Sequence, residues 1–235
     1  MAGWRLLRQA ARVCAFAATL GVGLFGAQSA SAVTIYAQGW NTPGDTQGWT
    51  PDVLNGVVSV PAAGGNPGGY LDLAEGPTFD IVGGVGNFPP IIGNYAAAGI
   101  FSVSFDINLF SGTFTLEAFR VRYKDATFNG WYHPVTYVAG GGWEHFVITF
   151  DPTWSDAQAI AAGWVSEGDQ DFATTMSDVF NPEIRLEGTG SNLHGGLDNF
   201  QVDARVLGVD EPGTVPLFVV GLLSLFGAMR RARRA

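Results

Sequence analysis

The sequence has little cysteine and few histidines, and several common catalytic motifs are missing from it. Its single cysteine, Cys14, lies close to the N-terminus, so the rest of the chain has no thiol for a disulfide, a nucleophile or a metal ligand. None of the three histidines, His133, His145 and His194, has the spacing of a zinc motif. A nucleophile elbow and a phosphate-binding loop are also absent. These absences argue against thiol, zinc, serine-hydrolase and nucleotide chemistry.

Basic residues are scarce outside the two termini. Three arginines lie within residues 1–12 and four within 230–234, which leaves five basic and all 21 acidic residues between them, a net charge of −16. Phosphate binding needs a basic face, so we expect no nucleic-acid partner. The excess of acid suits a soluble extracellular protein that attracts cations. The alternative is that the acidity only keeps the protein soluble.

The N-terminus has the three parts of a secretory signal peptide. Residues 1–12 are basic, residues 13–27 are apolar, and Ala30 and Ala32 complete an Ala-Ser-Ala site. This order predicts an N-terminal signal helix over 1–32 and cleavage by signal peptidase after Ala32. An N-terminal membrane anchor is the alternative.

The C-terminus also has three parts, over residues 209–235. An acidic, proline-containing turn (210–216) precedes an apolar run (217–229) and an arginine cluster (230–234). The uncharged stretch is at the short end of what crosses a bilayer, roughly 17–25 residues. Arginines stay on the cytoplasmic side. The pattern predicts a hydrophobic helix that holds the chain transiently in the inner membrane.

These features resemble the PEP-CTERM sorting signal of exopolysaccharide-producing Gram-negative bacteria. The matching residues are Glu211, Pro212, Thr214, Arg230, Arg231, Arg233 and Arg234, and the sequence departs at Asp210, where the family has proline. The resemblance implies cutting by an exosortase and delivery to the cell surface or extracellular matrix. An ordinary C-terminal membrane anchor is the alternative.

Residues 33–208 have the pattern of one all-β domain. Apolar residues alternate with polar ones over 101–109, and the alternation resumes over 114–123 after Ser111-Gly112, which predicts a hairpin. Strand 131–138 contains Pro134 and is expected at an edge. A capping box at Ser155 predicts one short helix. Many short strands separated by Gly/Pro turns favour an antiparallel β-sandwich.

Three phrases of this domain resemble the laminin B domain of bacterial exported proteins. They are Gly65–Leu71, Ile92–Tyr95 and Gly195–Phe200. Laminin B domains are jelly-roll sandwiches similar to carbohydrate-binding modules. The resemblance implies a role connected with glycans or the extracellular matrix, and it implies no catalytic residue.

Candidate ligand contacts follow from aromatic and acidic residues. Trp131 and Tyr132 follow a turn and are candidates for stacking on extracellular polysaccharide, with core packing as the alternative. Sandwich modules of the carbohydrate-binding type often hold a structural calcium between an early loop and the last strand. The matching candidates are Asp45, Asp72 and Asp198. The alternative is that Asp45 and Asp198 bond their own backbone in turns.

A glycosidase would need two facing carboxylates, and Asp106 with Glu117 is the best such pair in the sequence. Their alternative is a solvated strand face. We therefore expect an exported, non-catalytic surface or matrix protein. The alternative is a glycan-binding module, which calcium could support, and a glycoside hydrolase is a remote second alternative.

Overall fold

The computed structural model describes residues 31–52, 56–75, 81–124, 129–138 and 140–206. Residues 32–206 form one compact unit. Its strands are β1 (Ser31–Gln38), β2 (Trp49–Pro51), β3 (Val57–Ser59), β4 (Leu71–Ala74), β5 (Ile81–Gly86), β6 (Ile100–Tyr123), β7 (Gly130–Val135), β8 (Glu144–Thr149), β9 (Val165–Glu167) and β10 (Val179–Val206). Its helices are α2 (Tyr95–Ala98), α3 (Asp156–Ala161) and α4 (Phe172–Ser177). The expected antiparallel β-sandwich of jelly-roll type is confirmed.

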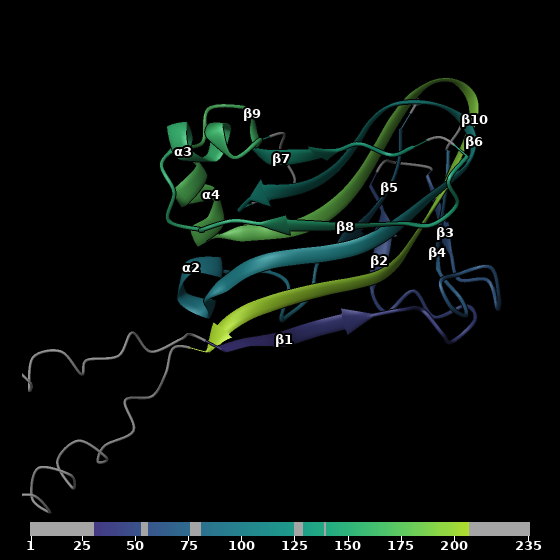
Figure 1. The fold of residues 1–235 in the computed structure, drawn as a ribbon, viewed down its shortest axis with the longest axis horizontal. Helices are drawn as coiled ribbons and strands as arrows, with labels where there is room; N and C mark the ends of the chain where they lie inside the picture. The colour runs from purple at the N-terminus through teal and green to yellow at the C-terminus, as the bar shows by residue number, and fades with distance from the viewer. Residues whose placement is uncertain (1–30, 53–55, 76–80, 125–128, 139, 207–235) are drawn as a thin grey trace, which may run out of the picture. The chain divides into compact units, whose positions relative to one another are not determined.

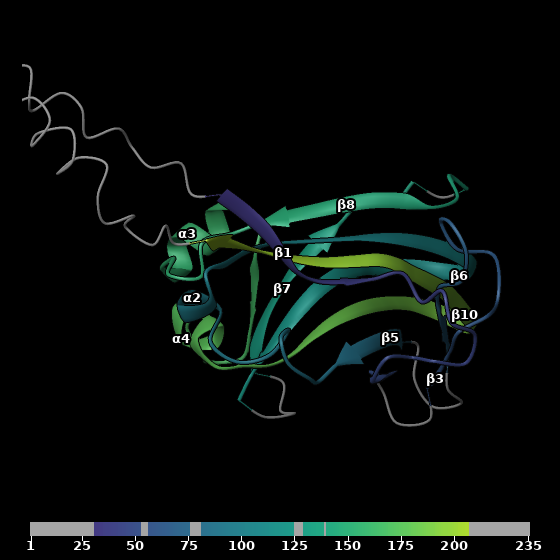
Figure 2. The same ribbon diagram turned by 90° about the horizontal axis from the view of Figure 1, so that it is seen from below.

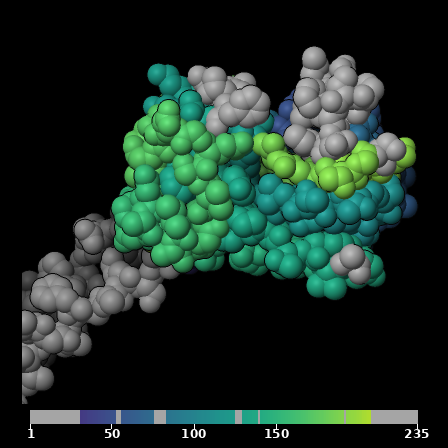
Figure 3. Space-filling view, turned by 90° about the horizontal axis from the view of Figure 1, so that it is seen from above, coloured from purple at the N-terminus to yellow at the C-terminus, as the bar shows by residue number. Residues whose placement is uncertain are grey.

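Two long strands, β6 and β10, build both layers of the sandwich. They pair with each other antiparallel along almost their whole length, from Val179 opposite Tyr123 to Ala204 opposite Ile100. The pairing register shifts between Thr189 and His194, where both strands bend from one layer into the other (Figure 1). Figure 3 shows the two strands side by side on one face.

Each half of this strand pair recruits its own neighbours. In the first layer, β8 pairs with the start of β6, while β4, followed by β3, pairs with β10, which also pairs with β1. In the second layer the order is β2-β5-β10-β6-β7-β9. Figure 2 shows β8 in one layer and β5 in the other, with the three short helices gathered at one end.

The core between the layers is rich in aromatic rings. Alternate residues of β6, such as Phe105 and Phe119, are fully buried because every second side chain of a strand points to the same face. The ring of Phe200 lies 5.0 Å from Trp49 between centroids, and the ring of Trp164 lies 5.2 Å from Phe172. Edge contacts between perpendicular rings fill the space between the sheets.

The predicted hairpin at Ser111-Gly112 is wrong. The chain bends there without turning back, and β6 continues with β10 as its partner on both sides of the bend. A bend and a turn share the same Gly-Ser composition, so the residues alone do not separate them. Likewise β10 continues through its own bend as one strand over Val179–Val206.

The structure also tests two smaller predictions, the edge strand that contains Pro134 and the helix after Ser155. Strand β7 lies between β6 and β9, so it is no edge strand as a whole. Its residue Pro134 falls beyond the stretch that pairs with β9, Gly130–Tyr132, so no neighbour on that side needs its missing N–H. The helix that begins after Ser155 is confirmed as α3, with its capping box. Helix α2, capped by Asn94, was not predicted.

Of the predicted terminal helices, residues 1–30 and 209–235 lie outside the described residues, and Ser31 and Ala32 belong to strand β1. Among those described, no helix has the length and apolar character that a membrane crossing requires. Ala30 and the sorting residues 211–234 also lie outside, whereas Ala32 is the second residue of β1.

Candidate ligand-binding site

A pocket of about 380 Å³ opens where β6 bends between the layers. Its walls come from the bend itself and from the segment between β7 and β8. The lining residues are Leu109, Phe110, Ser111, Gly112, Thr113, Phe114, Glu117, Tyr137 and Gly140. This volume is in the range of small-ligand sites, roughly 300–1,000 Å³.

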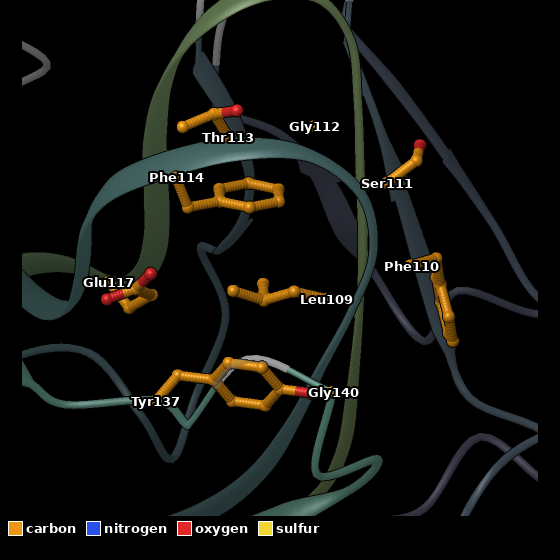
Figure 4. Close-up of a pocket in the computed structure, with 9 residues that line it drawn as sticks. All are labelled: Leu109, Phe110, Ser111, Gly112, Thr113, Phe114, Glu117, Tyr137 and Gly140. Atoms are coloured by element: carbon orange, nitrogen blue, oxygen red, sulfur yellow. The ribbon is translucent and has the colours of Figure 1, made fainter.

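Four of these side chains converge on the cavity. The rings of Phe114 and Tyr137 lie on opposite sides of it, with Leu109 between them and the carboxyl of Glu117 at one side (Figure 4). The Tyr137 hydroxyl donates to the Gly142 carbonyl oxygen at 2.7 Å, which fixes the ring. The pocket therefore combines apolar, aromatic walls with one acidic group.

The pairing register with β10 explains why Glu117 faces this cavity. In the β10 pairing it stands opposite Leu186, a core residue, so its side chain points inward at the open end of the sandwich. Burial raises the pKa of the Glu117 carboxyl above its usual value. Within the described residues, no cationic side chain forms an ion pair with it.

Three aromatic rings form a cluster beside the pocket, on the outward face of the first layer. Ring centroids of Tyr70 and Trp143 are 5.5 Å apart, and those of Tyr70 and Phe110 are 5.4 Å apart. The Trp143 indole N–H donates to the Gly64 carbonyl oxygen at 2.9 Å. Phe110, which belongs to both the cluster and the pocket, is 39% exposed. We call Tyr70, Phe110 and Trp143 the surface aromatic cluster.

The floor of the surface aromatic cluster is Gly196 of β10. A Cβ atom built there would lie 2.8 Å from Trp143 Cη2, 2.8 Å from Tyr70 Cδ2 and 3.0 Å from Phe110 Cε2. The three rings thus descend onto the strand because this residue has no side chain. Their planes are inclined to one another by 58–83°, so they form a compact cluster and not a flat platform.

Asp72 borders the surface aromatic cluster. Its carboxylate accepts hydrogen bonds from His194 at 2.5 Å and from Ser59 at 3.2 Å. Burial and the neighbouring Asp72 raise the pKa of Tyr70 to about 12. The donors around Asp72 hold it as a structural acceptor.

A second polar network covers the outward face of the second layer. Arg120 contacts Glu183 at 3.0 Å and Glu167 at 2.6 Å, and Arg122 contacts Glu183 at 2.7 Å and Asp52 at 2.6 Å. Burial and the adjacent Glu183 raise the pKa of Asp52 to about 8, which outweighs the opposing effect of Arg122. These groups form ion pairs with one another, so the network is a structural feature of this face.

Trp131, a predicted glycan contact, is buried. It is 1% exposed, its indole N–H donates to the Gln170 carbonyl oxygen at 2.9 Å, and its ring meets Phe172. Trp131 therefore packs in the core, which was the alternative to glycan contact. Its neighbour Tyr132 points to the opposite face of β7 and is half-buried, and its glycan contact stays a prediction.

The three predicted calcium ligands have separate partners. Asp45 accepts from the backbone N–H of Gln47 at 2.9 Å, as in a turn, and Asp72 is held by His194. Asp198 is fully buried and accepts from the N–H groups of Asn66 and Asn199. Among the residues with described positions, no three acidic or histidine side chains gather as a metal site. This arrangement favours the turn interpretation for Asp45, whereas Asp198 connects β10 to the distant segment that contains Asn66.

Asp106 and Glu117, the pair that a glycosidase would have needed, do not face each other across a cleft. Asp106 points outward in the first layer, where it bonds His145 at 2.6 Å and Asn199 at 2.7 Å, whereas Glu117 points into the pocket. The two residues lie on one strand, β6, on either side of its bend. From the sequence, Glu117 was a candidate only for catalysis, and Trp143 was no candidate for ligand contact. The glycine run before Trp143 was the one signal for an exposed loop position.

Comparisons with known proteins concern the fold. No protein-family profile matches the sequence, and no curated protein matches it. The structure is similar to the CBM22-1 xylan-binding domain of Paenibacillus barcinonensis Xyn10C (TM-score 0.48, 18% identity, 77% of this chain and 99% of that chain). It is also similar to a family 11 carbohydrate-binding module from Clostridium thermocellum, solved with a β-1,3-1,4-mixed-linked tetrasaccharide (TM-score 0.47, 14% identity, 73% and 96%). An exo-β-agarase matches over 74% of this chain and 25% of its own (TM-score 0.49, 13% identity).

Proposed function

We propose that the chain is an exported, non-catalytic protein that binds a polysaccharide at the pocket and at the surface aromatic cluster. The observation that carries this proposal is the continuity of the two through Phe110. Aromatic faces pack against the C–H faces of sugar rings, and one acidic group can accept their hydroxyl protons. A single carboxyl in the pocket supports binding better than hydrolysis, which needs two.

The test is affinity for a panel of soluble polysaccharides, with two site variants and one matched control. We expect Phe114→Ala and Trp143→Ala each to weaken binding by about tenfold, since interface aromatics commonly contribute more than about 1 kcal/mol. Phe101→Ala removes a half-buried ring at the other end of β6, beside Arg205, and should bind like the parent protein. Equal affinity of all four proteins would refute the site. If no glycan binds, a purely structural or adhesive surface role is the better account.

Export and sorting belong to the same proposal. The acidic body and the two terminal patterns support delivery to the cell surface through signal peptidase and an exosortase. Replacing Glu211 and Pro212 by alanine should leave uncut protein in the inner membrane, because the turn is what the protease would recognise. Asp210→Pro, which restores the family pattern, is the matched control and should be cut at least as well. Normal release of the double-alanine variant would contradict the sorting proposal.

Calcium binding is a separate part of the proposal, and Asp198 is its main candidate ligand. The measurement is the melting temperature with and without millimolar Ca²⁺, since a ligand of the folded state raises it. Asp198→Asn should abolish any shift. An unchanged melting temperature of the parent protein would leave the backbone-bonding role of Asp198 as its whole function.

A further inference from the structure

The acidic group of the pocket has no internal counter-charge. Glu117 is the single charged side chain among the nine lining residues, and within the described part of the chain it forms no ion pair. It is half-buried at one side of the cavity, whose opposite walls are the rings of Phe114 and Tyr137 (Figure 4). Most other acids of the second layer, by contrast, are matched to arginines, as Glu183 is to Arg120 and Arg122.

A cavity with two aromatic walls and a carboxylate at its side is a site for an ammonium group. The carboxylate supplies charge-assisted hydrogen bonds, and the ring faces attract the cation electrostatically. A bound cation would also offset the desolvation that Glu117 experiences in the free protein. A neutral hydroxyl would make one hydrogen bond but would not supply the missing charge.

The surroundings favour the same kind of ligand. The chain between the termini carries five basic and 21 acidic residues. Such a body repels uronic-acid polymers and concentrates cationic ones near its surface. The electrostatic field of this acidic body therefore favours a cationic ligand, as the carboxylate of Glu117 in the pocket does.

We propose that the pocket selects a protonated amino group of a sugar, so that the ligand is a polysaccharide with free amino sugars. The inference rests on the proposed glycan binding and specifies its ligand. A lysine side chain offers the same ammonium group. A sugar is favoured because the pocket shares Phe110 with the surface aromatic cluster, which adds aromatic surface for neighbouring sugar units along the polysaccharide.

The experiment compares three ligands, of which two are sugar hexamers that differ only in acetylation. Titration calorimetry of the purified protein at about pH 6 uses a glucosamine hexamer, an N-acetylglucosamine hexamer and a lysine hexapeptide. We expect the glucosamine hexamer to bind about tenfold more tightly than its acetylated form, as expected for one hydrogen bond to a charged group. Glu117→Gln should remove this preference, while Asp169→Asn, which removes an exposed acid elsewhere, should keep it.

The outcomes separate the two proposals. Equal affinity for both hexamers, or a preference that survives in Glu117→Gln, overturns the amino-sugar inference and leaves glycan binding intact. Equal affinity for the lysine hexapeptide, lost in Glu117→Gln, would show that the pocket recognises charge without the sugar. Binding of neither hexamer, together with binding of another glycan that Phe114→Ala weakens, refutes the inference alone. If the protein binds none of the glycans, the proposed function is refuted as well.

Discussion

The indole ring of Trp143 lies directly over the backbone of Gly196, with room for a hydrogen atom and none for a methyl group. A Cβ at position 196 would be 2.8 Å from Trp143 Cη2, shorter than any ordinary carbon–carbon contact. The position of a ring on the loop before β8 is therefore determined by a missing side chain on β10.

Gly196→Ala should displace the surface aromatic cluster. Because three rings meet the new methyl group, we expect a loss of about 1–3 kcal/mol in unfolding free energy, the usual cost of overpacking. Polysaccharide affinity should fall with it. Gly39→Ala is the control: its closest neighbour is the side chain of Asn41, at 3.3 Å. Denaturant unfolding and affinity measurements check both variants, and similar values for the two would contradict the packing described.

Trp131 gives a prediction that separates core from ligand contact. Trp131→Phe removes the hydrogen bond to Gln170 and should cost about 1 kcal/mol of stability, while Trp131→Ala should cost about 3–5 kcal/mol. The affinity of the remaining folded protein for polysaccharide should stay unchanged in both. Tyr132→Ala serves as the comparison, because its half-buried ring is on the opposite face. A drop in affinity for Trp131→Phe without loss of stability would speak against its burial.

The buried ion pairs of the second layer predict a large stability effect. Arg120→Met would leave Glu183 with one cation fewer in a site from which water is excluded, and we expect a loss of about 3–5 kcal/mol. Arg205→Met, at an exposed arginine stacked on Phe101, should cost less than about 1 kcal/mol. Equilibrium unfolding in urea measures both. Equal effects would mean that the Arg120 network is solvated.

Asp52 predicts how stability changes with pH. Its pKa is about 8 in the folded chain, against about 3.9 in an unfolded one, so the folded state keeps a proton that the unfolded state releases. Its stabilising contribution is complete below about pH 4 and is lost as the pH rises through about 8. Asp52→Asn, which mimics the neutral form, should therefore lose less stability over that interval than the parent protein. Thermal melting across the interval measures this, with exposed Asp45→Asn as control; identical slopes would contradict the raised pKa.

The local parts of the fold were predictable because they depend on local rules. Alternation over 101–109 follows from the two-residue period of a strand, and the helix after Ser155 follows from its capping box. The bend at Ser111-Gly112 was not, because a glycine-containing polar pair permits either a reversal or a bend. Pairing with a strand 80 residues away decides between them.

The site was harder to predict from the sequence than the fold. The inward orientation of Glu117 depends on its register against Leu186, and the position of the Trp143 ring depends on Gly196, which is distant in sequence. Trp131 looked exposed after its turn, but helix α4 supplies Phe172 to cover it. Composition indicates that aromatic and acidic residues are present, and only tertiary pairing decides which of them share a cavity.

Strands β1 and β10 run side by side, and the start of β1 and the end of β10 lie at the same end of the domain (Figure 1). The bends of β6 and β10, with the pocket, lie at the far end of the same strands. The domain thus carries the start of β1 and the end of β10 at one end and the pocket at the other. A tether fused to either terminus would hold the domain by the same end, leaving the pocket directed away from whatever bears it. A short peptide from Val206 to Ala32 should close the chain into a ring, and new termini could then be opened elsewhere.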